Sequence, residues 1–95
     1  MSFLARFRRN KPDPEIARRA SLLQNGRLGE ATILEINRDD EGNELLSYCY
    51  TIGGMDYETV QRLDAQQLSR KDIYLPGSRA DMRYDPRRPA NSLVV

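Results

Sequence analysis

Apolar and polar residues alternate along much of the second half of the chain. In residues 80–85, written ADMRYD, every second residue is apolar and the others are charged. A period of two places alternate side chains on opposite faces of a strand, so this segment predicts a strand with one buried face. The same alternation predicts a strand at 45–52. Its predicted inner face carries Leu46, Tyr48, Tyr50 and Ile52, and its outer face Ser47, Cys49 and Thr51.

Three further segments complete the predicted sheet. Residues 31–36, ATILEI, are rich in β-branched and apolar side chains, and the sequence DDEGN that ends at residue 43 is typical of a hairpin loop. Gly53-Gly54 predicts a tight turn into a strand at 55–62, and residues 93–95 supply the last strand. Because these segments leave no room for βαβ crossovers, we expect an all-β fold: a small five-stranded antiparallel barrel or strongly bent sheet.

The connection between the third and fourth strands is polar. Residues 64–72 lack strand character, so they form either a helical turn or a long connection. The following sequence Tyr74-Leu75-Pro76-Gly77 predicts a type II turn. Pro76 presets φ at the second position of that turn, and Gly77 accepts the positive φ of the third.

One helix is predicted before the sheet, at about residues 14–24. Asp13 is suited to the N-cap and Pro14 to the first helical position. Asn25-Gly26 predicts a left-handed helix stop. The apolar residues that recur at helical spacing are Ile16, Ala20 and Leu23, with Ala17 beside them. We therefore expect an amphipathic helix with one apolar stripe.

Charge divides the chain into a basic start and an acidic body. Residues 1–27 hold seven Lys or Arg and two acidic residues, a net charge of +5, whereas residues 28–95 hold eight and twelve, a net charge of −4. We expect a basic arm at 1–12 and a single domain at 13–95, whose β part begins at about residue 28.

The composition argues against most catalytic chemistry. The 95 residues include no histidine and one cysteine, Cys49. Histidine is the commonest general acid or base near neutral pH and the commonest metal ligand. We therefore predict no catalytic residue, cofactor-binding residue or metal ligand, and an enzyme is the least favoured class.

The start lacks the features of a secretory signal, and no apolar run is long enough to span a membrane, so we expect a cytoplasmic protein.

Several turn motifs occur in a recognisable order. They comprise Gly29 and Ala31; Tyr50, Gly54 and Tyr57; Tyr74, Pro76 and Gly77; and Tyr84, Asp85, Pro86, Pro89 and Ser92. Together they resemble a bacterial family called domain of unknown function 3592, over residues 29–92. The resemblance implies a small β domain of a kind often attached to transmembrane helices, and it implies no catalytic residue. In this chain a basic arm and an amphipathic helix stand where such an anchor is expected.

The segment RYDPRRP at 83–89 has two interpretations. Pro86 and Pro89 cannot donate to a strand ladder, so the segment can simply end a strand and form a turn. Alternatively, its arginines contact an anion, because guanidinium groups form paired hydrogen bonds with phosphate or carboxylate. The candidate anion or partner contacts are Arg79, Arg83, Arg87 and Arg88.

The basic arm also has two interpretations. It is either an ordinary charged terminus or a segment that inserts apolar side chains into an anionic membrane surface. The candidate membrane contacts are Phe3, Leu4, Arg6, Phe7, Arg8 and Arg9. A third alternative concerns the helix, whose apolar stripe would be buried against a second copy of the chain in a dimer.

The tyrosines leave a further alternative open. Tyr48, Tyr50 and Tyr57 either stack on nucleic-acid bases, as aromatic residues do on an OB-fold, or fill a small core. The acidic body opposes phosphate binding, so nucleic acid is the less favoured partner.

We expect a non-enzymatic interaction module that binds a protein partner or itself, peripheral to the inner face of a membrane. The alternative is a small β-barrel that binds nucleic acid or another anion.

Overall fold

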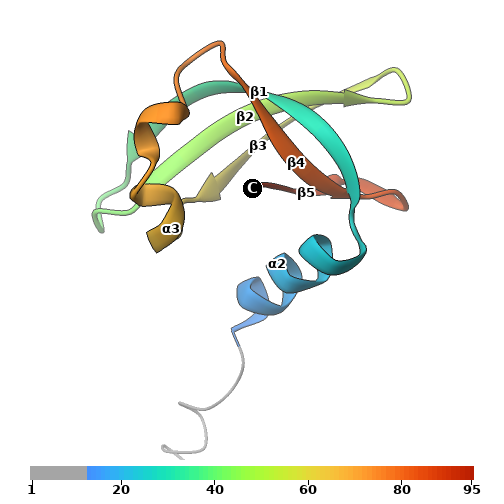
Figure 1. Cartoon of the computed structure of the whole chain (residues 1–95), viewed down its shortest axis with the longest axis horizontal. Coiled ribbons are helices and arrows are strands. Elements are labelled where there is room, and N and C mark those ends of the chain that lie inside the picture. Colours follow the sequence, from blue (N-terminus) through green and yellow to red (C-terminus); the bar gives the residue numbers. More distant parts are fainter. Residues whose placement is uncertain (1–12) are drawn as a thin grey trace, which may run out of the picture.

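The computed structural model describes residues 13–95, and it is mainly β (Figure 1). Five antiparallel strands form one strongly bent sheet in the order β3-β2-β1-β4-β5, which confirms the predicted fold class. The strands are β1 (Arg27–Arg38), β2 (Glu44–Ile52), β3 (Met55–Arg62), β4 (Arg79–Asp85) and β5 (Arg88–Val94). The helices are α2 (Pro14–Asn25), the short α3 (Ala65–Leu68) and a 3-10 turn at Lys71–Ile73. None of the helices in residues 13–95 has the length and apolar character needed to cross a membrane.

The sheet bends because β1 has two different partners along its length. Its first half pairs with β4, and its second half pairs with β2; Thr32 is the residue paired with both. The β1–β2 register shifts between Ile33 and Glu35, which marks a β-bulge at Leu34. A bulge bends its strand and increases the local twist, so β1 curls the two halves of the sheet toward each other.

The core lies inside this bend and matches the predicted alternation. Leu46, Tyr48 and Tyr50 of β2 are buried and Ile52 is half-buried, as predicted from the period of two. The buried cluster consists of Ala31, Ile33, Leu46, Tyr48, Tyr50, Leu63, Tyr74, Met82, Tyr84 and Val94. The predicted inner face of β2 is therefore confirmed.

The two edge strands, β3 and β5, are bridged by one side chain. The Gln61 amide nitrogen donates to the Val94 carbonyl at 3.0 Å, and the Val94 N–H donates to the Gln61 side-chain oxygen at 2.8 Å. Gln67 of α3 also donates to the Val94 carbonyl, at 2.8 Å. Gln61 thus supplies the two bonds that a neighbouring strand would make. We call this gap between β3 and β5 the seam.

The segment 83–89 forms the hairpin between β4 and β5. The Asp85 carboxylate accepts from the Arg87 N–H at 2.9 Å, so Pro86 and Arg87 form the turn. β5 begins at Arg88, five residues earlier than predicted, and it includes Pro89. The β4–β5 register shifts beside Tyr84, so β5 continues through Pro89 although this residue has no N–H to donate to β4. The predicted strand end is confirmed, since β4 stops at Asp85 before Pro86, whereas the prediction that the last strand begins only at residue 93 was wrong.

The other turns agree with the sequence, apart from one glycine. Gly77 has φ of 86° and follows Pro76, as a type II turn requires. Gly26, in contrast, has φ of −69°, so the predicted left-handed helix stop is wrong. A Cβ added at Gly26 would lie 2.4 Å from the Leu22 carbonyl oxygen and 3.0 Å from the Arg83 Cβ. Glycine is required here by the close approach of α2 to β4.

Replacing Gln61 with leucine should open the seam. The Val94 N–H would be buried without a partner, and each such loss costs about 1–3 kcal/mol. We expect Gln61→Leu to lower the free energy of unfolding in urea by roughly that amount. The exposed neighbour Gln66, whose side chain makes no hydrogen bond among residues 13–95, provides the control Gln66→Leu. Equal effects of the two substitutions would contradict the bridging role of Gln61.

Replacing Gly26 with alanine should be costly although its φ suits any residue. The added Cβ would overlap the Leu22 carbonyl, and overpacking of this kind costs about 1–3 kcal/mol. The control is Gly42→Asn, because Gly42 has φ of 84° and open space around it, and asparagine tolerates that conformation. We expect thermal unfolding to show a clear loss for Gly26→Ala and a small change for Gly42→Asn. The reverse order would contradict the steric explanation.

Candidate interaction site

Helix α2 starts as the sequence predicts. The Asp13 side chain accepts from the Glu15 N–H at 2.9 Å, and Pro14 occupies the first turn. Glu15 then binds two arginines that lie one turn further along. Its carboxylate oxygens are 2.7 Å from the Arg18 Nε and 2.7 Å from the Arg19 Nε. The first two turns of α2 therefore carry a compact charged cluster on one side.

This charged side faces the seam. Arg18 donates to the Asn91 side chain and to the Ser92 carbonyl of β5, both at 2.9 Å. Arg19 donates to the Arg62 carbonyl at the end of β3. The helix therefore binds both edge strands, and Leu22 is its one buried residue among 14–25. Figure 1 shows α2 below the open side of the sheet.

The two arginines hold the Glu15 carboxylate in its charged form. The hydrogen bond from Arg18 contributes most, the hydrogen bond from Arg19 adds to it, and partial burial opposes both. Together they lower the pKa of Glu15 from 4.5 to about 2. The helix is thus fixed to the barrel by groups that remain ionised at neutral pH.

The apolar stripe of α2 stays exposed beside the barrel. Ile16 is 67% exposed and Leu23 is 53% exposed, and Ala17 and Ala20 are also exposed. The predicted spacing is therefore present, but the stripe is not buried against the helix's own β domain. A helix that exposes its apolar stripe leaves a surface for another molecule.

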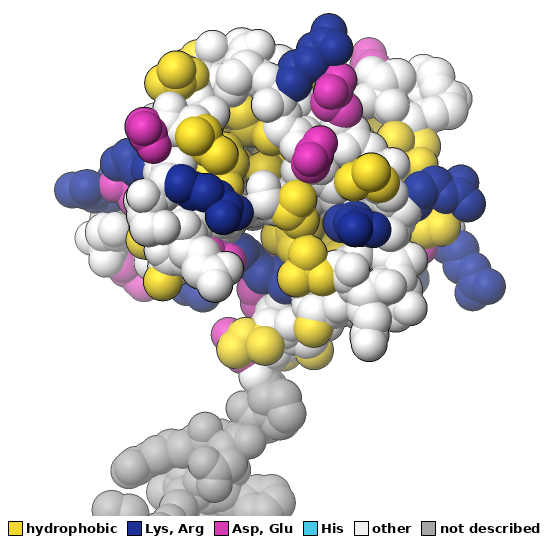
Figure 2. Space-filling model, in the orientation of Figure 1, with side chains coloured by type: hydrophobic (Ala, Val, Ile, Leu, Met, Phe, Trp, Pro, Cys, Tyr) yellow, Lys and Arg dark blue, Asp and Glu magenta, His cyan; other side chains and the backbone are white. Residues whose placement is uncertain are grey.

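An apolar groove continues from this stripe across the end of β5. Leu23 lines a groove of about 140 Å³ together with Leu93, Val94 and Val95. Gln66 and Gln67 of α3 also line it, as do Arg19, Asp64 and Arg70. Val95 also borders a second groove, which Ile73 lines. Figure 2 shows hydrophobic side chains gathered on this face of the molecule. We call the exposed residues Ile16, Ala20, Leu23 and Ile73, together with the half-buried Val95, the α2 surface.

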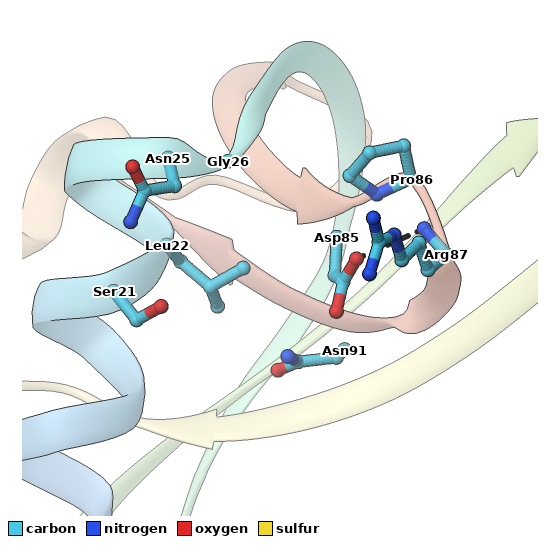
Figure 3. A pocket seen from close by; sticks show the side chains of 8 residues that line it. All are labelled: Ser21, Leu22, Asn25, Gly26, Asp85, Pro86, Arg87 and Asn91. Atoms are coloured by element: carbon cyan, nitrogen blue, oxygen red, sulfur yellow. Dashed lines mark hydrogen bonds between the residues drawn. The ribbon is translucent and has the colours of Figure 1, made fainter.

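A more polar cavity lies at the other end of α2 (Figure 3). It has a volume of about 400 Å³ between the helix end and the β4–β5 hairpin. The lining residues are Ser21, Leu22, Asn25, Gly26, Asp85, Pro86, Arg87 and Asn91. In Figure 3 the Asp85 and Arg87 side chains lie beside each other at the hairpin. The cavity is open, and its one acidic and one basic side chain favour no single sign of charge.

The four arginines predicted as anion contacts are spread along β4 and its hairpin. Arg79, at the start of β4, lies 3.1 Å from the Glu30 carboxylate. Arg83 donates to the Gly26 carbonyl at 3.2 Å. Arg87 lines the polar cavity, and Arg88 is exposed opposite Asp85. Because β4 spans roughly 20 Å, Arg79 and the hairpin arginines are at opposite ends of it and do not form one patch.

The tyrosine rings face the interior instead of forming an exposed stacking surface. Tyr48 is 1% exposed and Tyr50 is 5% exposed, and burial raises the pKa of Tyr48 to about 12. The Tyr48 hydroxyl lies 2.7 Å from the Ser92 hydroxyl, and Tyr50 donates to the Pro89 carbonyl. Tyr57 stacks on Tyr50 with ring centroids 5.2 Å apart. These rings connect β2 and β3 to β5, so their faces are not free for bases.

The remaining predicted contacts lie elsewhere or outside the structure. The predicted membrane contacts, Phe3, Leu4, Arg6, Phe7, Arg8 and Arg9, lie outside the described residues. Cys49 is half-buried and its thiol is free. Within residues 13–95, no three His, Cys, Asp or Glu side chains are grouped so that they could hold a metal ion.

Three residues that organise the site were not singled out from the sequence: Arg18, Arg19 and Gln61. The spacing of Glu15 from Arg18 and Arg19 was a usable signal, because residues three and four apart share a helix face. Gln61 was also detectable as a polar residue at an inward position of the β3 alternation.

Comparison of the chain with family models, curated proteins and solved structures finds no match. The functional argument therefore rests on the geometry of the α2 surface.

The contribution of Glu15 to stability should depend on pH. Because its pKa is lower in the folded protein than in the unfolded chain, its stabilising effect is present above about pH 4.5 and is lost as the pH falls toward 2. The Glu15 side chain is 37% exposed, so solvent screening limits its contribution to the free energy of unfolding to about 1 kcal/mol. We expect urea unfolding of Glu15→Gln to show lower stability than the wild type at pH 7. The difference should shrink between pH 4.5 and 2, and a difference that is constant with pH would contradict this explanation.

Proposed function

We propose that this protein is a non-enzymatic interaction module that binds a protein partner through the α2 surface. The observation that carries the proposal is the orientation of α2, whose charged side contacts the barrel and whose apolar stripe stays exposed beside it. Surface helices of globular proteins ordinarily bury the apolar stripe. Exposed apolar side chains that adjoin one another favour an interaction site.

The helix cannot easily rotate to bury the stripe on its own barrel. Arg18 and Arg19 bind opposite sides of the seam, and the close contact at Gly26 fixes the end of the helix against β4. Rotation would break these hydrogen bonds and leave the Ser92 and Arg62 carbonyls without their arginine donors. A partner that covers Ile16 and Leu23, in contrast, would remove apolar area from water without disturbing the fold.

The charge around the stripe favours a protein surface over an anionic membrane. Ile16 borders a small groove lined by the carboxylates of Asp13, Glu15 and Asp64 and by Arg19 and Arg62, so its charges nearly balance. This groove offers no excess of positive charge to an anionic leaflet, whereas peripheral helices that bind such lipids carry Lys and Arg beside the apolar face. Binding to a membrane is assigned in this proposal to the basic arm, residues 1–12. The resemblance to domain of unknown function 3592 is consistent with a location at the inner face of a membrane.

The arrangement of the arginines and tyrosines gives less support to nucleic-acid binding. Arg79 is paired with Glu30, and the rings of Tyr48 and Tyr50 are buried. Proteins that bind single strands combine a continuous basic groove with exposed aromatic faces. The protein-binding proposal is therefore preferred to the anion-binding alternative.

Site-specific photo-crosslinking in living cells tests the proposal. A photoreactive residue at position 20, in the middle of the stripe, should give one discrete protein adduct. The same residue at position 25, which is exposed and lies about 140° around α2 from position 20, should give none. Adding Leu23→Asp to the position-20 protein should reduce the adduct about tenfold or more, because a charge would be buried in the contact.

The controls separate a lost contact from a lost fold. Leu23 is exposed, so Leu23→Asp should change the free energy of unfolding by about 0.5 kcal/mol or less. An adduct with a second copy of the chain would identify the partner as the protein itself. Equal adducts from positions 20 and 25, or adducts confined to lipid or nucleic acid, would contradict the proposal.

A further inference from the structure

The outer edge of β3 presents main-chain groups without partners among residues 13–95. β3 pairs with β2 on one side, through a tight turn at Gly53-Gly54 that places Ile52 opposite Met55. In a hairpin with a two-residue turn, the flanking pair is hydrogen-bonded and the bonding then alternates. The residues of β3 whose N–H and C=O groups point away from β2 are therefore Asp56, Glu58, Val60 and Arg62.

One contact supports this assignment. The Arg62 carbonyl accepts a bond from Arg19 of α2, as expected for a carbonyl that points away from β2. The preceding residue, Gln61, reaches Val94 through its side chain instead of its main chain. Asp56, Glu58 and Val60 have no main-chain hydrogen bond to any other described residue beyond the β2–β3 pairing. Their N–H and C=O groups form the repeating pattern that an added strand requires.

The other edge of the sheet does not offer the same pattern. On β5, the Pro89 carbonyl accepts from Tyr50, the Ser92 carbonyl accepts from Arg18, and both main-chain groups of Val94 are bonded to Gln61. Pro89 has no N–H to donate. Side chains thus cover the edge of β5, whereas the edge of β3 is covered at Arg62 and open from Asp56 to Val60.

Charge indicates which kind of strand fits. The side chains of Asp56 and Glu58 are exposed on the outer face of β3. With Glu30 they line a groove of about 740 Å³ that crosses the outer face of the sheet, where Arg79 is already paired with Glu30. A strand added beside β3 places alternate side chains next to Asp56 and Glu58, and opposite charges on neighbouring strands are stabilising.

A second copy of β3 fits this edge poorly. The antiparallel register that uses all three open residues of both copies places Glu58 directly opposite Glu58. Like charges that face each other across a ladder are destabilising. The edge is therefore suited to a different segment that carries Lys or Arg at alternate positions.

We propose that the β3 edge from Asp56 to Val60 binds an extended basic segment of a partner protein as a sixth strand. Main-chain hydrogen bonds to Asp56, Glu58 and Val60 would supply the pairing, and the two carboxylates would select basic side chains. This surface is separate from the α2 surface, so each can be tested without the other.

Amide hydrogen exchange of the full-length protein, followed by NMR, tests the edge directly. In the free protein, the amides of residues 56, 58 and 60 should exchange fast, whereas those of Tyr57 and Thr59, which face β2, should be protected. An eight-residue peptide of alternating Lys and Thr should slow exchange at 56, 58 and 60 and leave 57 and 59 unchanged. A Glu and Thr peptide of the same length should have no effect.

Two variants connect the effect to the proposed groups. Glu58→Lys should weaken binding of the basic peptide roughly tenfold and raise binding of the acidic one, because the selecting charge is reversed. Val60→Pro removes one outward N–H, which an edge strand tolerates, and should weaken binding of the basic peptide; Val60→Thr is its matched control. A Lys and Thr peptide with methylated main-chain nitrogens should not bind.

Other outcomes overturn the proposal. Protection of residues 56, 58 and 60 in the free protein would mean that the edge is already covered. In that case, protection that rises with protein concentration would show that a second copy of the chain covers the edge. Protection that does not change with concentration would show that residues 1–12 cover it. Binding of the basic peptide that is unaffected by Glu58→Lys or by main-chain methylation would show charge attraction without strand pairing.

Discussion

The pair of hydrogen bonds between the Gln61 side chain and the Val94 main chain determines how this small sheet is completed. β3 and β5 are the two ends of the strand order, and they are not joined by a strand ladder. A side-chain amide presents an N–H donor and a C=O acceptor in nearly the geometry of a peptide group, so Gln61 replaces one residue of a missing strand. The buried rings of Tyr48 and Tyr50 then reach β5 as well. The core is enclosed without a sixth strand.

The same seam explains why α2 is held by charge. Near the seam, the Ser92 and Arg62 carbonyls lack ladder partners and need donors. An apolar helix face could not supply those donors, whereas Arg18 and Arg19 can. Glu15 offsets the cost of bringing two guanidinium groups together. Satisfying the edges of the sheet thus takes up the charged side of the helix and leaves its apolar side exposed.

The hairpin at 83–89 contributes to the same arrangement. The bond from the Arg87 N–H to Asp85 and the ring of Pro86 define a tight turn, and the register shift after Arg88 brings Asn91 beneath Arg18. The distinctive residues of this segment thereby set the position of α2. The two edges of the sheet are left unequal, because side chains cover β5 and only the end of β3.

Local patterns in the sequence determined the elements. The alternation in β2 and β4, the Gly53-Gly54 turn and the Asp13 cap each follow from groups a few residues apart, so their chemistry can be read along the chain. The tertiary structure alone decided which side of α2 faces the barrel, since the helical period allows either side to do so. It also decided that Gly26 serves close packing instead of positive φ, and that Gln61 bridges to Val94 across 33 residues. These features depend on which carbonyls the bent sheet leaves without partners, and that becomes defined only when distant segments meet.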